Sequence, residues 1–221
     1  RSLTQAINEA KTVALFVGAG VKDAREQVLA LAEKIKAPIG HALGGKMYIQ
    51  YDNPFDVGMS GLLGYGAAHD ATHEADLLIL LGTDFPYNDF LPKENVAQVD
   101  IDGSHIGRRT KIKYPVTGDV AATIENILPH IDEKKDRRFL DKMLKEHYNK
   151  LNHVVEAYTK KAEKMKPIHP EFVANIIDEE AADDAVFTVD TGMCNVWGAR
   201  YITPNGKREQ IGSFRHGTMA N

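Results

Sequence analysis

The sequence predicts a doubly wound α/β fold, in which a mostly parallel sheet carries helices on both faces. Two observations support this prediction. Short apolar runs alternate with helical patterns over the first 130 residues, and the runs are too continuously apolar to leave one face exposed. Strands of parallel sheets are buried on both faces and read in this way, and an alternation of strands with helices is typical of the architecture.

Five apolar runs are the expected strands of this sheet. The first covers residues 12–17 (TVALFV), and the second opens at residues 38–39. The third is LLILL at residues 77–81, which is too apolar to be half exposed. The fourth and fifth cover residues 96–101 and 114–117. These five segments should form the core of the first domain.

Helices are expected between and after these strands. Residues 23–36 carry apolar side chains at the spacing of one helix face. These side chains are Ala24, Val28, Leu31 and Ile35. A second helix is expected over residues 120–131. Residues 132–166 are dense in charged side chains, so we interpret them as one or two solvated helices linking two domains, with a partner-binding helix as the alternative.

A second α/β alternation begins after two prolines at residues 167 and 170. We expect a helix over 171–181, a strand over 185–189, a helix over 194–201 and a strand near 210–214. The predicted organisation is a first domain (1–131), a charged helical linker (132–166) and the opening of a second α/β domain (167–221). Because the chain starts without Met and stops soon after a strand-like segment, we expect it to be a piece of a longer protein.

The composition is that of a globular protein. The chain has 221 residues, 43% of them hydrophobic, and a formal net charge of −4. This charge provides no basic surface for nucleic acid. The single Cys excludes an internal disulfide framework and a cysteine-based zinc site. The sequence also lacks a run of about 18 apolar residues, the signature of a bilayer-spanning helix.

Chemistry-bearing residues follow the ends of the predicted strands, where ligands bind in open α/β sheets. Gly18 and Gly20 follow the first strand. Backbone N–H groups in such a turn can approach a phosphate, and a tight turn is the alternative. Residues 82–86 follow the third strand, while Asp100 and Asp102 end the fourth. An acid at that position can accept a hydrogen bond from a ribose or ribityl hydroxyl, or it can cap the following turn.

Four glycines fall within residues 58–66 (GMSGLLGYG). Neither a helix nor a strand needs them, whereas a backbone lying against a flat or extended ligand does, and a mobile loop is the alternative. His69 and His73 have a spacing that a helical metal site can use, but an ordinary helix face is the preferred interpretation. Cys194 is expected to pack or to contact the backbone. These residues predict a nucleotide-like cofactor in the first domain and do not identify the reaction.

A series of motifs runs nearly from end to end of the chain. They are KIKAPI at 34–39, HAL at 41–43, GK at 45–46, YDNP at 51–54, DVGM at 56–59, LGT at 81–83, FPY at 85–87, VDID at 99–102, DTG at 190–192, Trp197, NGKR at 205–208, GSF at 212–214 and HGTMAN at 216–221. With these motifs the sequence resembles the thiamine-diphosphate-dependent pyruvate oxidase family, and most closely its bacterial pyruvate dehydrogenase (quinone) branch.

The resemblance implies a three-domain enzyme of which this chain is a fragment. The domain with the activating glutamate would precede Arg1, the FAD-binding middle domain would be present, and only the opening of the diphosphate-binding domain would follow. The Mg²⁺ motif would lie beyond Asn221. The resemblance therefore implies no catalytic residue and no metal ligand in this chain, and an inactive fragment.

The resemblance also implies cofactor contacts by position. Those for FAD are Gly18, Gly20, Met59, Ser60, Gly61, Leu62, Gly82, Thr83, Asp84, Phe85, Pro86 and Asp100. Those for thiamine diphosphate are Thr191, Gly192, Met193, Cys194, Gly217, Thr218 and Met219. One departure stands out: some oxidases carry an Arg near the position of Leu62, and a side-chain salt bridge to the flavin phosphates could not form from leucine.

The implied reaction is oxidative decarboxylation of pyruvate, with electrons passing through FAD. The acceptor would be a membrane quinone, giving acetate, or O₂ with phosphate, giving acetyl phosphate. The full-length enzyme would be a homotetramer or homodimer, cytoplasmic or peripheral on the inner face of the cell membrane through a C-terminal tail. The alternatives are an acetolactate synthase with FAD that has no net redox role, and a non-catalytic nucleotide-binding module.

Overall fold

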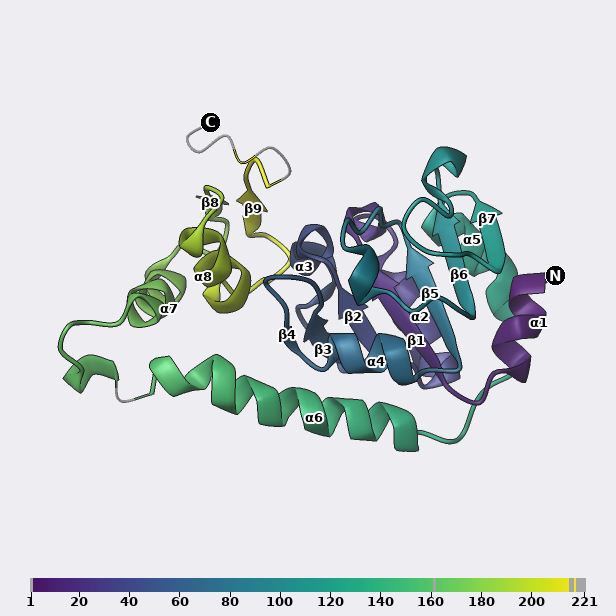
Figure 1. The fold of residues 1–221 in the computed structure, drawn as a ribbon, viewed down its shortest axis with the longest axis horizontal. Coiled ribbons are helices and arrows are strands. Elements are labelled where there is room, and N and C mark those ends of the chain that lie inside the picture. Colours follow the sequence, from purple (N-terminus) through teal and green to yellow (C-terminus); the bar gives the residue numbers. More distant parts are fainter. Residues whose placement is uncertain (1, 161, 215–216, 218–221) are drawn as a thin grey trace.

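A seven-stranded sheet forms the centre of the first domain (Figure 1). The computed structural model describes residues 2–160, 162–214 and 217. Along the sheet the strand order is β4-β3-β2-β1-β5-β6-β7. The strands are β1 (Val13–Val17), β2 (Ile39–His41), β3 (Asp56–Met59), β4 (Tyr65–Gly66), β5 (Leu77–Leu81), β6 (Val96–Asp100) and β7 (Tyr114–Thr117). Only the β3–β4 pair among these is antiparallel.

Helices cover both faces of this sheet, which confirms the predicted doubly wound α/β fold. They are α1 (Ser2–Glu9), α2 (Arg25–Ile35), α3 (Lys46–Ile49), α4 (Ala68–Glu74), α5 (Val120–Ile127) and α6 (Arg138–Val154). Helices α1, α2 and α5 bury their apolar faces in one core cluster. Helices α4 and α6 contribute to a second cluster on the other face.

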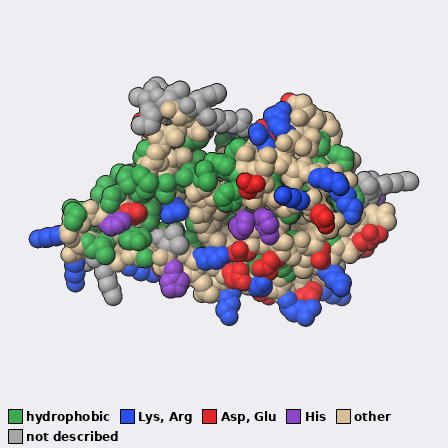
Figure 2. Space-filling view, viewed as in Figure 1, with side chains coloured by type: hydrophobic (Ala, Val, Ile, Leu, Met, Phe, Trp, Pro, Cys, Tyr) green, Lys and Arg blue, Asp and Glu red, His purple; other side chains and the backbone are tan. Residues whose placement is uncertain are grey.

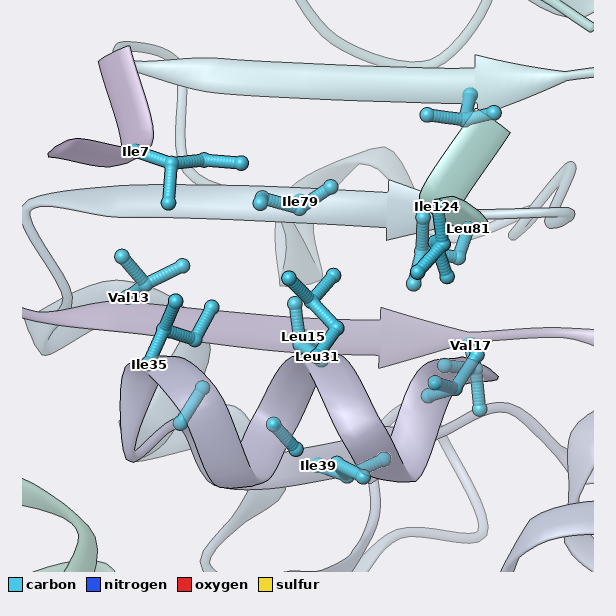
Figure 3. Close-up of a cluster of buried hydrophobic side chains, with 14 of the residues drawn as sticks. Ile7, Val13, Leu15, Val17, Leu31, Ile35, Ile39, Ile79, Leu81 and Ile124 are labelled. Atoms are coloured by element: carbon cyan, nitrogen blue, oxygen red, sulfur yellow. The ribbon is translucent and has the colours of Figure 1, made fainter. Parts of the chain in front are cut away.

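The central strands divide their side chains between these two clusters. Leu15 and Val17 of β1 pack with Leu31 of α2 and Ile124 of α5 (Figure 3). The intervening residue Phe16 belongs to the second cluster. Since side chains alternate across a strand, both faces of β1 are covered and all five of its residues are buried.

The predicted elements of the first domain form with small shifts at their ends. The helix expected over residues 120–131 is α-helical only to Ile127, and a 3₁₀ turn follows over Leu128–His130. Pro129 lies in that turn, and its missing N–H cannot extend the α-helical hydrogen bonds. Strands β3 and β4 were not among the expected elements.

The charged segment forms one long helix that packs on the sheet. Helix α6 spans 17 residues and lies against β3, β4 and α4. It buries Leu140, Met143 and His147, which recur at the spacing of one helix face. Two short 3₁₀ turns follow it, at Glu156–Tyr158 and Ala162–Lys164. The segment is therefore solvated on one side and part of the domain's packing on the other.

The C-terminal unit contains α7 (Pro170–Glu180), β8 (Val186–Thr188), α8 (Met193–Tyr201) and β9 (Glu209–Ile211). These four elements match the expected alternation of helices and strands. Strands β8 and β9 form a separate parallel pair. Figure 1 shows α8 and β9 on the side of the sheet that carries α3. Throughout the described residues, no helix combines the length and the apolar character that crossing a membrane requires.

Candidate functional site

A cavity of about 770 Å³ opens at the carboxyl ends of the parallel strands. Its walls come from the segments that follow β1, β2, β3, β5, β6 and β7, and from α8 and the segment after β9. Cofactor pockets typically have volumes of about 300–1,000 Å³. In open α/β sheets this edge is the usual ligand-binding edge, so the cavity is the candidate site.

The residues expected to contact FAD gather at this cavity. All of them except Gly61 line it: Gly18, Gly20, Met59, Ser60, Leu62, Gly82, Thr83, Asp84, Phe85, Pro86 and Asp100. They come from four separate strand ends, far apart in the sequence. Gly61 lies beside them in the turn between β3 and β4, with a φ of +108°.

Glycines after β1 and β5 bring two turns into contact with each other. A Cβ atom on Gly18 would lie 2.6 Å from the carbonyl oxygen of Gly82, and one on Gly20 would lie 2.7 Å from the Cα of Gly82. Gly82 itself has a φ of +55°, which favours glycine. These glycines are required by the contact between the two turns, and the joined turns form one wall of the cavity.

Two glycines of the segment 58–66 are explained by packing between strands and not by a ligand. Gly58 and Gly66 pair with each other across β3 and β4. A Cβ atom on Gly66 would lie 2.2 Å from Nδ1 of His147, and one on Gly58 would lie 3.1 Å from the same ring. For Gly58 and Gly66 the expectation that no strand needs a glycine is therefore wrong, because the imidazole of His147 and the neighbouring strand backbone leave no room for a side chain.

Asp84 lines the cavity, but its carboxylate is already paired. Its Oδ1 accepts a hydrogen bond from Nε of Arg109 at 2.9 Å, and its Oδ2 accepts from Arg109 and Arg108 at 3.1 and 3.0 Å. The hydrogen bonds from Arg109 lower the pKa of Asp84 despite its burial. A ligand here would meet the backbone of Asp84 more readily than its charge.

Asp100 caps the following turn, which is one of the two roles that the sequence allowed, and it also lies at the cavity. Its Oδ1 accepts a hydrogen bond from the backbone N–H of Asp102 at 3.0 Å, and it lies 3.3 Å from Nδ1 of His105. It also lines the cavity while remaining only 5% exposed. Asp102 caps the following turn through the N–H of Ser104 and does not line the cavity.

Gln98 is a positioning residue that the sequence analysis did not identify. It lies in the middle of β6 and is 3% exposed. Its amide nitrogen donates to the carbonyl oxygens of Thr83 and His105, and its amide oxygen accepts from the N–H of Gly107. It therefore joins the loops after β5 and β6, both of which line the cavity. The sequence signal that could have identified Gln98 is its polar side chain in the middle of an otherwise apolar strand.

Two buried polar atoms of the cavity wall have no hydrogen-bond partner among the described residues. They are Oγ of Ser60 and Oδ1 of Asn195, on side chains of residues 6% and 7% exposed. Buried polar atoms in native proteins are nearly always hydrogen-bonded, so these two suit a ligand with polar groups. Asn195 belongs to α8, and no local sequence pattern links it to the strand ends.

Of the residues expected at thiamine diphosphate, those that the structure describes do not line this cavity. Thr191 and Gly192 precede α8, and Met193 and Cys194 open it. Cys194 is exposed, and its Sγ donates to the carbonyl oxygen of Asp190, which confirms the expected backbone contact. Gly217 lies next to Thr191, since its Cβ position is 3.7 Å from Thr191 Cγ2. Thr218 and Met219 lie outside the described residues.

The candidate histidine pair lies on the surface of α4. The rings of His69 and His73 have centroids 4.2 Å apart. Within residues 2–160, 162–214 and 217, no three His, Cys, Asp or Glu side chains gather closely enough to hold a metal ion.

Comparison with known proteins identifies the family. The family model described as thiamine pyrophosphate enzyme, central domain, matches residues 1–127, which is more than half of the chain. The chain belongs to the thiamine pyrophosphate enzyme family. The matched region contains the whole seven-stranded sheet and most of the cavity wall.

The curated relatives of this thiamine pyrophosphate enzyme chain are much longer than the chain. A protein of Pseudomonas amyloderamosa is 45% identical over 67% of the chain and 38% of its own length. YdaP of Bacillus subtilis, named provisionally as thiamine pyrophosphate-containing, is 37% identical over 97% of the chain. An acetolactate synthase of Mycobacterium bovis is 29% identical over 99%. The chain spans 37% of the length of each of the last two.

A solved structure shares the fold of the chain. It is described provisionally as a thiamin diphosphate-dependent enzyme from Mycobacterium smegmatis, and it superposes with a TM-score of 0.69. The match covers 95% of this chain and 40% of that one, at 19% sequence identity. The likeness supports the same arrangement of strands and helices.

Proposed function

We propose that this chain is part of an enzyme that oxidatively decarboxylates pyruvate with thiamine diphosphate, and that the cavity of about 770 Å³ holds FAD. The observation that carries the proposal is the meeting of separate strand ends, each with residues expected at a flavin, around one cavity. Family membership supports thiamine diphosphate as a cofactor of the whole protein. Pyruvate as the substrate rests on the resemblance of the sequence.

The residues around the cavity fit an extended dinucleotide. The glycine turns after β1 and β5 expose backbone close to the ligand volume. Ser60 and Asn195 offer unpartnered polar atoms at the wall. Phe85 and Phe214 supply aromatic surface against which a flat ring can be shielded from water. Asp100 is placed to accept a hydrogen bond from a sugar or ribityl hydroxyl.

The packing of the wall suits the task of holding a flat cofactor in one orientation. Phe85 is 3% exposed, and its ring meets Phe16 edge to face at 4.9 Å. Because Phe16 lies within the core of the sheet, the wall is supported from behind. FAD, when bound, supplies the electron acceptance of the reaction. The chain would contribute binding, orientation and exclusion of water.

Thiamine diphosphate would lie at the amino end of α8. Thr191, Gly192, Met193 and Cys194 surround this end, and Gly217 lies against Thr191. Helix amino ends favour phosphate groups because their N–H groups are free to donate. Thr218 and Met219 are proposed to continue this site. The Mg²⁺ ligands and the glutamate that activates the cofactor are proposed to belong to parts of the enzyme outside residues 1–221.

Acetolactate synthase is the second candidate function, favoured by an acetolactate synthase of Mycobacterium bovis that matches 99% of the chain. Under both proposals the cavity holds FAD, but only oxidation of pyruvate requires its reduction. The electron acceptor would be a quinone or O₂. We propose a homotetramer or homodimer for the full-length enzyme, in the cytoplasm or peripheral on the inner face of the cell membrane.

Titration of the purified 221-residue chain with FAD tests the cavity assignment. Saturable binding, with quenching of flavin fluorescence and a yellow protein after gel filtration, is expected. Asn195→Leu should weaken binding at least about fivefold, because the amide contact is lost, and Asn175→Leu on α7 is the matched control away from the cavity. A chain that remains colourless at saturating FAD contradicts the assignment. In the full-length enzyme, bleaching of the flavin by pyruvate without O₂ separates the oxidase from the synthase.

A further inference from the structure

Lys46 is a buried cation at the junction between the sheet and the C-terminal unit. It begins the short helix α3 and is 1% exposed. Its Nζ donates a hydrogen bond to the carbonyl oxygen of Ile202. Ile202 is the residue that caps the carboxyl end of α8, so the contact joins residues 156 positions apart in the sequence. A buried lysine with a partner on another unit needs an explanation, because burial of an ammonium group is costly.

The two ends of this contact are both next to the cavity. On the sheet side, Gly45 packs against the end of β1, where its Cβ atom would lie 2.8 Å from the carbonyl oxygen of Val17. Leu43 and Gly44, just before it, line the cavity. On the other side, α8 carries Asn195 into the cavity wall. The position of α8 therefore decides where the Asn195 amide lies relative to the strand ends.

Charge around Lys46 comes from both units. Asp56 of β3 and Asp178 of α7 both favour its charged form, while burial opposes it more strongly and lowers the pKa of Lys46 to about 7. The carbonyl at the carboxyl end of α8 also carries the negative end of the helix dipole. A cation between these groups loses its favourable partners if α8 moves away from the sheet.

Other contacts across the junction are weaker or apolar. Arg200 donates to the carbonyl oxygen of Gly64 at 3.4 Å. Ala199 packs in a small cluster with Met59 and Tyr65. Apolar contacts of this size tolerate small shifts in position, whereas a hydrogen bond from a buried cation requires one geometry. A buried ionic contact contributes little net stability once its desolvation is counted, so its effect should be on position.

We propose that Lys46 is a positioning residue of the cofactor cavity: its ammonium group fixes the carboxyl end of α8 against the sheet and so sets the place of Asn195. The proposal rests on the proposed function of the cavity for its consequence in flavin binding. The contact between the two units is a separate matter, which can be measured without a ligand.

The test compares Lys46→Met with Lys134→Met in the 221-residue chain. Lys134 is the matched control because its Nζ donates to the carbonyl oxygens of Ala10 and Asn8, and none of these three residues lines the cavity. Amide hydrogen exchange reports on each segment. In Lys46→Met, exchange in α8 and β9 should speed up at least about tenfold while β1 and β5 keep their protection. FAD affinity should fall by at least about tenfold. In Lys134→Met neither should change.

If a folded Lys46→Met variant exchanges its α8 and β9 amides at the wild-type rate, the proposal is overturned. It is also overturned if Lys134→Met speeds up exchange in α8 and β9 as much as Lys46→Met does. If Lys46→Met does not fold, Lys46→Gln serves instead, since its side chain is one bond too short to reach Ile202. If the wild-type chain takes up no FAD, the proposed function fails, and the exchange measurement still decides whether Lys46 positions α8. Faster exchange with unchanged FAD affinity shows that the contact does not set the cavity, and it also overturns the proposal.

Discussion

The seven-stranded sheet and the C-terminal unit bury their apolar residues very differently. Every residue of β1 and β5 is buried, and helices pack on both faces of the sheet. In β8 and β9 the two outer residues are exposed, and α7 has no buried residue. Figure 2 shows hydrophobic side chains gathered over the part of the molecule that contains α7 and α8. Exposed examples are Ile168, Val173, Ile176, Ile177 and Val186.

This difference in burial means that the two regions are held in place in different ways and form different parts of the cavity wall. The sheet has a core of its own, so burial of apolar surface determines its structure. A pair of strands such as β8 and β9 is at best marginally stable by itself, so the placement of the C-terminal unit depends on contacts such as those of Ala199 and Lys46. The cavity has walls from both regions. Its shape therefore combines a well-packed wall with one that is more easily displaced.

The largest expected effect is on the core of the sheet. Phe16→Ala should lower the free energy of unfolding by about 3–5 kcal/mol, because the side chain is fully buried and would leave a cavity. The matched change in the other region is Ile177→Ala, at a residue that is 49% exposed. That variant should stay within about 0.5 kcal/mol of wild type. Urea denaturation followed by circular dichroism measures both. Equal losses in the two variants contradict the comparison.

The edge of the sheet gives a second, smaller effect. Gly66 and Gly107 have nearly the same φ, +77° and +78°, but only Gly66 has a neighbour within 4 Å of its Cβ position. Gly107→Ala should cost about 1–2 kcal/mol for the left-handed backbone alone. Gly66→Ala should cost about 1–3 kcal/mol more, because the new methyl group meets His147 and the carbonyl oxygen of Val57. Thermal unfolding of both variants, with and without His147→Ala, isolates this excess. An excess that is unchanged without the imidazole shows that His147 is not its cause and leaves the contact with the carbonyl oxygen of Val57.

The parts of the fold predicted from sequence are those where local pattern and burial agree. The continuous apolar runs of β1 and β5 and the amphipathic spacing of α2 are examples. Strands β3 and β4 were not predicted because they are short and contain glycines. These glycines make room for His147, which is 89 positions beyond Gly58 along the chain, and no local pattern reports such a contact.

The sequence predicted the part of the candidate site that belongs to the sheet, and it did not predict the part that belongs to the C-terminal unit. Residues after β1, β5 and β6 could be placed together, because the carboxyl ends of parallel strands meet at one edge of a sheet. Asn195 and Phe214 belong to the other unit, and their place depends on how two units pack. The pairing of Asp84 with Arg108 and Arg109 could not be predicted from the sequence either, because it joins two loops about 25 positions apart.

Asp84, in the cavity wall, should make the stability of the protein depend on pH in the acid range. The pKa of Asp84 is lowered by its hydrogen bonds from Arg109, so the folded state binds fewer protons at this site than the unfolded chain does. The resulting stability is present above the ordinary Asp pKa of about 3.9 and is lost as the pH falls through the folded-state pKa.

Asp84→Asn should therefore lower the free energy of unfolding at neutral pH by about 1.5–3 kcal/mol, the contribution of hydrogen bonds to charged groups. Near pH 2–3 the variant and the wild type should converge. Asp136→Asn is the control, since Asp136 also pairs with an arginine but is exposed to solvent, and it should change the stability far less. Denaturation curves across this pH range provide the measurement. A constant difference at all pH values shows that the charge of Asp84 is not responsible.

The smallest expected effect concerns Leu62, which lines the cavity and is 70% exposed. Its replacement should leave the free energy of unfolding within about 0.5 kcal/mol of wild type, because little buried surface is lost. Two unit charges about 4 Å apart in water attract by about 1 kcal/mol. If the diphosphate of FAD lies near this loop, Leu62→Arg should strengthen FAD binding up to about fivefold at low salt, and the gain should shrink at high salt. Leu62→Gln, of similar size but uncharged, should show no gain. Flavin fluorescence titrations at two ionic strengths measure the FAD affinity of both variants. Tighter binding by both variants indicates packing as the cause. If Leu62→Arg does not bind FAD more tightly, the diphosphate lies away from the loop.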